Sequence, residues 1–129
     1  MSFEIVWEAN GVVFRFVNEM TSDTLITANL EALNNPKFKT INYQLMDLRD
    51  VSSYPIETSA IRRVAELDAR AYKINPNVKV ALVANQVVAK GLLNMYNVYF
   101  EIAGNDLRWQ SEIFESIQDA YNWINSQQP

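Results

Sequence analysis

The sequence contains neither cysteine nor histidine. Without cysteine, the chain cannot form a disulfide bond, a thiolate nucleophile or a cysteine-based zinc site. Without histidine, it lacks the commonest general base at neutral pH and the commonest transition-metal ligand, so no Ser-His-Asp or Cys-His device can form within this chain alone. Because glycine-rich phosphate loops and metal-ligand spacings are missing as well, we expect a non-catalytic protein without a cofactor or bound metal.

Long hydrophobic runs and an excess of basic residues are missing too. No apolar run approaches the roughly 20 residues that span a bilayer, and the first residues, MSFEIVWEANG, lack the features of a signal peptide. The net charge of -4, from 15 acidic and 11 basic residues, argues against nucleic acid as a partner. With 129 residues, 49% of them hydrophobic, the chain fits one cytoplasmic domain covering residues 1–129.

Strand and helix patterns alternate along the chain. Residues 3–9 alternate apolar and polar side chains, and Asn10-Gly11 predicts a type I′ hairpin turn into a returning strand. Further strands are predicted over 41–48, 78–84 and 109–114. Helices are predicted from a cap at 21–23 to residue 33, and over 57–74, 86–103 and 115–125. We expect Gly104 to end the third helix, and Ser116 with Asp119 to open the fourth.

These elements predict an α/β fold with the order β-β-α-β-α-β-α-β-α. Strands that alternate with helices indicate parallel pairing through right-handed crossovers, with helices on both faces of the sheet. The N-terminal hairpin adds one antiparallel pair, which gives a mixed five-stranded sheet. No internal repeat, linker or low-complexity tract interrupts this order, so we expect a single domain.

Six stretches carry a likeness to a known family: NGVVFRFVNEMTSD, INYQLMDLRDVSSY, IRRVAELDARA, NPNVKVALVAN, MYNVYFE and SEIFESIQDAYNWI. With this order of elements, they resemble the SpoIIAA-like (STAS-like) family of bacterial proteins, also described as STAS/Sec14-type domains. The resemblance covers essentially the whole chain and implies a SpoIIAA-like fold. The family's better-known relatives, the anti-sigma factor antagonists, bind a partner protein under the control of phosphorylation. Lipid or small-ligand binding is associated with the more distant Sec14-type relatives.

The resemblance also concerns a phosphorylation switch. In the antagonists, a strand ending in Asp-Leu leads to Asp-Ser-Ser-Gly, where a serine at the start of the next helix is phosphorylated. Here Asp47-Leu48 matches the strand end, but Pro55-Ile56-Glu57-Thr58 takes the place of Asp-Ser-Ser-Gly. Glu57 supplies negative charge at the helix start, as a permanent mimic of phosphate would. We therefore expect no regulatory phosphoserine in the loop from Asp47 to Ser59.

A group of polar residues is predicted just beyond the carboxyl end of a central strand, the edge where ligands usually lie in open α/β sheets. Its members are Asp47, Arg49, Asp50, Ser52 and Ser53, with Asn85 and Gln86 nearby at the end of the next strand. One interpretation is a small polar pocket or a recognition patch. The other is that Asp47 and Ser53 bond loop amides while Arg49 pairs with Asp50 or another acid.

Asp68 falls on the apolar side of the predicted second helix. At about 100° per residue, this side also contains Ile61, Val64, Ala65, Ala71 and Tyr72, whereas Arg62, Arg63, Glu66, Arg70 and Lys73 lie on the opposite side. A carboxylate on an apolar stripe costs free energy unless it is paired or hydrogen-bonded. Asp68 therefore either has a structural partner, such as a backbone amide, Tyr72 or a base, or lines a cavity.

The predicted third helix is too apolar for a single buried stripe. Its expected core face consists of Val88, Gly91, Leu92, Met95, Tyr99 and Ile102. A second flank, about 100° away on the same helical wheel, consists of Ala89, Leu93, Tyr96 and Phe100. This flank either packs against a neighbouring helix or forms an exposed patch for a protein partner, a second copy or an apolar ligand.

Together these features predict a regulatory or binding domain that acts through protein–protein contacts. The predicted contact surface is the flank with Leu93, Tyr96 and Phe100, which we expect to form a weak homodimer or to capture a partner. The alternative is a module that binds a lipid or another small apolar molecule between its helices. A cavity lined by the third helix would favour the ligand, and a flat patch would favour the protein partner.

Overall fold

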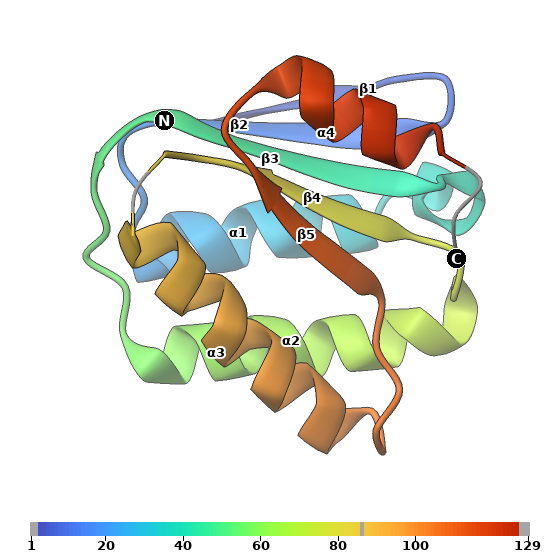
Figure 1. Ribbon diagram of the computed structural model, residues 1–129. Helices are drawn as coiled ribbons and strands as arrows, with labels where there is room; N and C mark the ends of the chain where they lie inside the picture. Colours follow the sequence, from blue (N-terminus) through green and yellow to red (C-terminus); the bar gives the residue numbers. More distant parts are fainter. Residues whose placement is uncertain (1–2, 86, 127–129) are drawn as a thin grey trace.

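A computed structural model describes residues 3–85 and 87–126 of the chain. Within these residues it contains a five-stranded sheet and four α-helices, in the predicted order (Figure 1). The strands are β1 (Phe3–Trp7), β2 (Gly11–Glu19), β3 (Tyr43–Ser53), β4 (Lys79–Val83) and β5 (Gln110–Phe114). The helices are α1 (Ser22–Leu33), the short 3-10 helix η1 (Pro36–Thr40), α2 (Thr58–Ile74), α3 (Val87–Ala103) and α4 (Ile117–Ile124).

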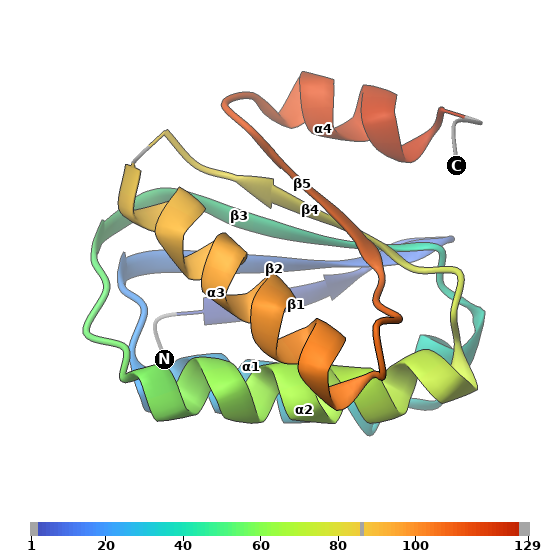
Figure 2. The same ribbon diagram turned by 60° about the horizontal axis from the view of Figure 1, so that its bottom comes forward.

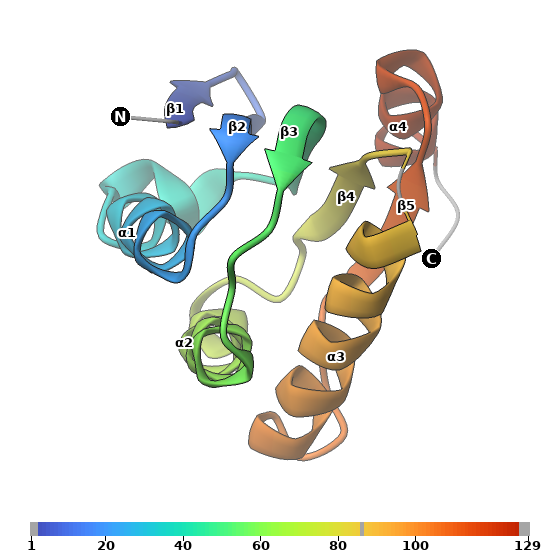
Figure 3. The same ribbon diagram turned by 90° about the vertical axis from the view of Figure 1, so that its left-hand side faces the viewer.

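The strands lie side by side in the order in which they occur in the sequence, β1-β2-β3-β4-β5. The β1–β2 pair is antiparallel and the other pairs are parallel, which confirms the predicted mixed sheet. Because each crossover moves one strand in the same direction, right-handed connections place α1, α2 and α3 on one face. The fourth helix, α4, covers the opposite face (Figures 2 and 3). The prediction of helices on both faces is confirmed.

The turn between β1 and β2 differs from the predicted type I′ turn. Neither Asn10 nor Gly11 has a positive φ, and Gly11 is already the first residue of β2. The amide of Glu8 donates to the carbonyl oxygen of Gly11 at 2.8 Å, which closes the turn. Gly11 is needed for space, because a Cβ there would overlap the ring of Tyr43 on the adjacent strand.

Helix α3 ends at Ala103, so Gly104 follows its last residue as predicted, but without the left-handed conformation that such glycines commonly have. Gly104 does not have a positive φ, whereas Asn105 and Asp106 do, at 56° and 70°. The glycine is again required for close approach, because an added Cβ would overlap the carbonyl oxygen of Leu107. The two following residues therefore reverse the chain towards β5.

Strand β3 continues well beyond the predicted end at Leu48. It pairs with β2 as far as the Glu19–Ser53 pair, with irregularities in register after Arg15 and after Asn18. Its pairing with β4 stops at the Asp47–Val83 pair. The stretch that polarity predicts as a loop is therefore a two-stranded extension of the sheet. Its polar side chains face water because β4 does not reach alongside it.

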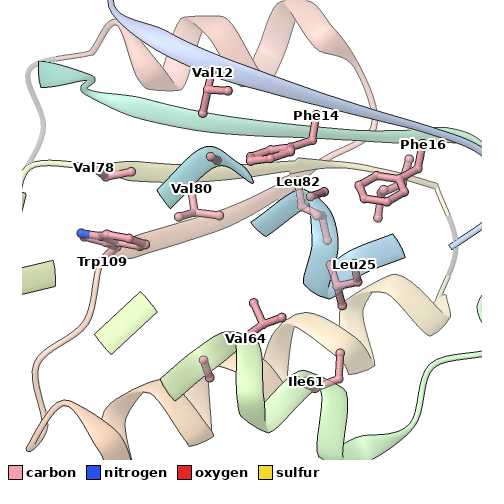
Figure 4. Packing of buried hydrophobic residues seen from close by; sticks show 14 of the residues in the cluster. Val12, Phe14, Phe16, Leu25, Ile61, Val64, Val78, Val80, Leu82 and Trp109 are labelled. Atoms are coloured by element: carbon pink, nitrogen blue, oxygen red, sulfur yellow. The ribbon is translucent and has the colours of Figure 1, made fainter. Parts of the chain in front are cut away.

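Two hydrophobic cores fill the layers on either side of the sheet. Side chains alternate between the faces along each strand, so Phe14, Phe16 and Leu82 belong to the larger core under α1, α2 and α3. Figure 4 shows these strand side chains opposite helix residues such as Leu25, Ile61 and Val64. The smaller core under α4 consists of Tyr43, Leu45, Ala81, Val83 and Ala120.

The buried side of α3 is rotated towards the second flank relative to the prediction, although Leu92, Met95 and Tyr99 of the expected core face also pack against the core. Ala89 and Phe100, assigned to the second flank, are completely buried, whereas Val88 and Ile102, assigned to the core, are 54% and 73% exposed. The ring of Phe100 packs against Tyr72 of α2 at a centroid distance of 6.4 Å. A helix with apolar residues all round does not reveal from its own sequence which side meets the sheet. The flank therefore packs inside the molecule and is not an exposed patch.

Candidate functional site

Asp47 and Arg49 form an ion pair with three contacts. Arg49 donates through Nε to Oδ1 at 2.9 Å and through Nη2 to Oδ2 at 3.0 Å, and its backbone amide donates to Oδ1 at 3.2 Å. Burial alone would raise the pKa of Asp47, but these bonds and the charges of Arg49 and Arg15 together lower it below its ordinary value. The charge on Asp47 is thus matched by a cation of its own strand.

The other predicted polar residues of the β3 extension, Asp50, Ser52 and Ser53, bond across to β2. Asp50 pairs with Arg15 at 3.0 Å, so of the two alternatives predicted for Arg49 the structure shows the pair with another acid, Asp47, and not the pair with Asp50. Ser52 donates to the carbonyl oxygen of Asn18 at 3.0 Å, and Ser53 to the carboxylate of Glu19 at 3.4 Å. Asn85 is exposed after the end of β4, and Gln86 lies outside the described residues. This arrangement supports the interpretation in which these polar side chains are used in hydrogen bonds and ion pairs within β2 and β3.

A cavity of about 80 Å³ lies between the sheet and the three helices on its larger side. A cavity needs about 10–15 Å³, measured in this way, to hold one water molecule. The cavity is therefore large enough for more than one water. Strands β2, β3 and β4 contribute Phe14, Phe16, Met46 and Leu82 to the lining, and α3 contributes Leu92 and Leu93. The third helix therefore lines a cavity, which is the condition that favours a small ligand.

Asp68 lines this cavity and binds two neutral donors. It is 2% exposed. Asn29 of α1 donates through Nδ2 to Oδ1 at 2.9 Å, and the hydroxyl of Tyr96 in α3 donates to Oδ2 at 2.6 Å. Burial raises the pKa of Asp68 to about 6, although both hydrogen bonds act against the increase. Burial, together with the charge and hydrogen bond of Asp68, raises the pKa of Tyr96 well above its usual value.

Two polar atoms around the cavity have no hydrogen-bond partner within the described part of the chain: Oδ1 of Asn29 and Nε2 of Gln44. Asn29 and Gln44 are 8% and 4% exposed, and both line the cavity. Sequence reasoning missed both residues. The available signals were a glutamine within the apolar stretch INYQLMDL and an asparagine one residue after Ala28 on the buried side of α1.

The structure brings together three of the predicted site residues, Asp68, Leu93 and Tyr96, at the cavity. Phe100 is not among the lining residues; its ring packs against Tyr96 and Trp109 at 5.6 and 5.3 Å between centroids. Within residues 3–85 and 87–126, no group of three or more acidic side chains is placed to hold a metal ion. Over the same residues, no helix combines the length and the apolar character needed to cross a membrane.

Comparison with known proteins gives a likeness of fold. No family model matches the sequence, and no curated protein matches it. The chain is similar to the crystal structure of an uncharacterized protein of the DUF3478 family from Shewanella loihica PV-4, described as having a SpoIIAA-like fold. The two are 16% identical; the match covers 95% of this chain and 91% of that chain, with a TM-score of 0.53. The fold is SpoIIAA-like, as the sequence resemblance implied.

Proposed function

We propose that this chain is a non-catalytic binding domain that takes up a small, mainly apolar molecule between its sheet and helices. The observation that carries the proposal is the cavity, where an apolar lining surrounds a few polar groups from different elements. This combination is typical of ligand sites, in which apolar contacts supply affinity and polar groups fix orientation. A SpoIIAA-like fold is compatible with such a regulatory or binding role.

The size of the cavity limits the ligand. A cavity of about 150 Å³ holds benzene, so one of about 80 Å³ suits a molecule of roughly three to five non-hydrogen atoms, or the end of a longer chain. The best small ligands gain about 1.5 kcal/mol per non-hydrogen atom. A five-atom ligand therefore binds with a Kd no lower than the micromolar range.

The test combines native mass spectrometry with xenon binding. Freshly purified protein is examined for a retained molecule, and NMR under xenon pressure locates the filled space, because xenon enters apolar cavities. We expect xenon to shift resonances of Phe14, Leu82 and Leu92. Ala28→Leu should prevent binding, because Ala28 lines the cavity. Thr27→Leu, at an exposed position of the same helix outside the cavity lining, is the control. Xenon that leaves the cavity resonances unchanged would contradict the proposal.

A second candidate function is protein binding through the outer side of α3. Val87, Val98 and Ile102 are 86%, 56% and 73% exposed, and with Gly91 they follow one stripe of the helix at spacings of four or seven residues. Exposed apolar stripes favour association with a partner or a second copy. Sedimentation of the wild type and of Val98→Glu with Ile102→Glu tests this. A wild-type protein that stays monomeric and captures no partner would contradict this second function.

A further inference from the structure

We propose that the ligand of the cavity is a small neutral molecule with both a hydrogen-bond donor and an acceptor, such as a short-chain alcohol or carboxamide. The inference rests on the proposed function and specifies the chemistry of that same site. It follows from three features of the lining: the orientation of Asn29, the free amide nitrogen of Gln44, and the charges around the cavity.

Asp68 fixes the orientation of the Asn29 amide. An ionised carboxylate only accepts hydrogen bonds, so Asn29 must turn its nitrogen towards Asp68, and it does so at 2.9 Å. The second oxygen of Asp68 is occupied by the hydroxyl of Tyr96. The carbonyl oxygen of Asn29 is therefore left as a buried acceptor without a donor. A ligand that binds beside it should offer an N–H or O–H group.

Gln44 presents the complementary group. Its nitrogen Nε2 is a buried donor without an acceptor among the described residues, on a side chain that lines the same cavity. Buried polar groups are nearly always satisfied in native proteins, because an unpaired group loses its bonds to water without replacement. A ligand oxygen that accepts from Gln44 while its own hydrogen is donated to Asn29 satisfies both groups.

The charges around the cavity exclude an ionised ligand. The lining contains one carboxyl group, that of Asp68, and neither lysine nor arginine. A carboxylate or phosphate inside the cavity would be unpaired and close to a like charge, which is strongly unfavourable in an apolar environment. An ammonium ion has three donors and no acceptor, so it cannot satisfy the free donor of Gln44. A neutral group remains.

The experiment measures the affinities of four matched ligands by NMR titration at pH 8, where Asp68 and propionate are both ionised. Propan-1-ol and propionamide carry a donor and an acceptor, butanone carries an acceptor alone, and propionate is an anion. We expect the first two to bind at least roughly fivefold more tightly than butanone, which is the effect of about one hydrogen bond, and propionate to bind most weakly. Equal affinities, or tightest binding of propionate, would overturn the inference.

Gln44→Met removes the donor while keeping an unbranched side chain of similar length. We expect this variant to bind propan-1-ol and propionamide roughly fivefold more weakly and to bind xenon as the wild type does. Met46→Leu is the matched control, because Met46 lines the cavity two residues further along β3 and the change conserves volume. Xenon binding without preference among the ligands refutes this inference alone. Failure of xenon and of every ligand to bind refutes the proposed function as well.

Discussion

The two sides of the sheet each bury an aspartate, and the two carboxyl groups have opposite surroundings. Tyr43 and Leu45 show that odd-numbered residues of this part of β3 face α4, so Asp47 lies on that side, where Arg49 lowers its pKa despite burial. Asp68 lies on the larger side, is bonded by two neutral groups, and has its pKa raised by burial. A buried acid with its own cation is explained by structure alone, whereas one beside a cavity without a cation points to a site.

Packing follows the same division. On the side of α4, Lys79 is held by the carbonyl oxygens of Trp123 and Ser126, both at 3.0 Å, and the small side chains Ala81 and Ala120 let helix and sheet approach closely. On the other side, three helices pack on the sheet and leave a cavity between them, with polar atoms around it. Where one helix covers a sheet it can be fitted closely; where three meet, a cavity can persist at their junction.

The largest expected effect is the difference in stability between substitutions on the inner and outer sides of α3. Phe100→Glu should unfold the protein, because it replaces a fully buried ring with an unpaired charge. Ile102→Glu, at a position 73% exposed, should change the free energy of unfolding by less than about 0.5 kcal/mol. Circular dichroism during urea unfolding measures both. A folded Phe100→Glu protein would show that this side of α3 is not the packed one.

The second prediction concerns pH and the two aspartates. The pKa of Asp68 is about 6 in the folded protein against an ordinary 3.8, so its protonated form is favoured by folding. Its contribution is fully present below pH 4 and is lost as the pH rises through 6. At about 1.4 kcal/mol per pKa unit, the loss is about 3 kcal/mol. Relative to Asp68→Asn, the wild type should therefore become less stable between pH 4 and 7.

Asp47→Asn is a control for which the opposite dependence of stability on pH is expected. The pKa of Asp47 is lowered in the folded protein, so its contribution is present above the ordinary value of 3.8 and is lost as the pH falls below it. Relative to Asp47→Asn, the wild type should lose stability on acidification. Free energies of unfolding from urea titrations at several pH values measure both differences. Slopes of the same sign for the two pairs would contradict the contrast between the two sides of the sheet.

The third prediction compares two buried alanines. Ala28 of α1 lines the cavity and Ala120 of α4 lies in the smaller core; they are 1% and 0% exposed. Ala28→Leu should stabilise the protein by about 0.5–2 kcal/mol by filling space. Ala120→Leu should destabilise it by about 1–3 kcal/mol through overpacking. Thermal unfolding of both variants gives the comparison, and similar losses in the two would mean that the larger side is as closely packed as the smaller.

The smallest expected effect is on the outer side of α3. A Cβ added at Gly91 meets no atom within 4 Å, so Gly91→Ala should raise the free energy of unfolding by about 1 kcal/mol through helix propensity. Gly104→Ala should destabilise the protein, because its Cβ overlaps the carbonyl oxygen of Leu107. Chemical denaturation measures both changes. A loss of stability in Gly91→Ala would indicate that a second copy covers this position.

Much of the fold could be predicted because its signals are local. The period of the apolar residues gives the strands and helices, and Thr21 and Ser116 accept hydrogen bonds from Thr24 and Asp119 as helix caps. The end of β3 could not be predicted, because polar residues on a two-stranded extension have the composition of a loop. The faces of α3 could not be predicted either, since the orientation of a helix that is apolar all round depends on which elements meet it.

The site could be predicted only in part. Asp68 stands out as an acid on an apolar stripe, and Tyr96 and Leu93 lie on the flank considered for a ligand. Asn29, which donates a hydrogen bond to Asp68, is 39 residues away along the chain, and Gln44 belongs to a third element, β3. Nothing in one sequence links an asparagine of α1 to a glutamine of β3, because their proximity results from the packing of three helices on the sheet.

The strand order has a consequence for how the chain folds. Every strand pairs with the one that precedes it in the sequence, so each new pairing closes only the loop that contains a single crossover helix. Contacts over short separations favour rapid folding, and the sheet can grow from the N-terminal hairpin in the order of synthesis. We expect pulse-labelled hydrogen exchange to protect amides of β2 and β3 before those of β5. Simultaneous protection of all strands would show that the sheet instead forms in one step.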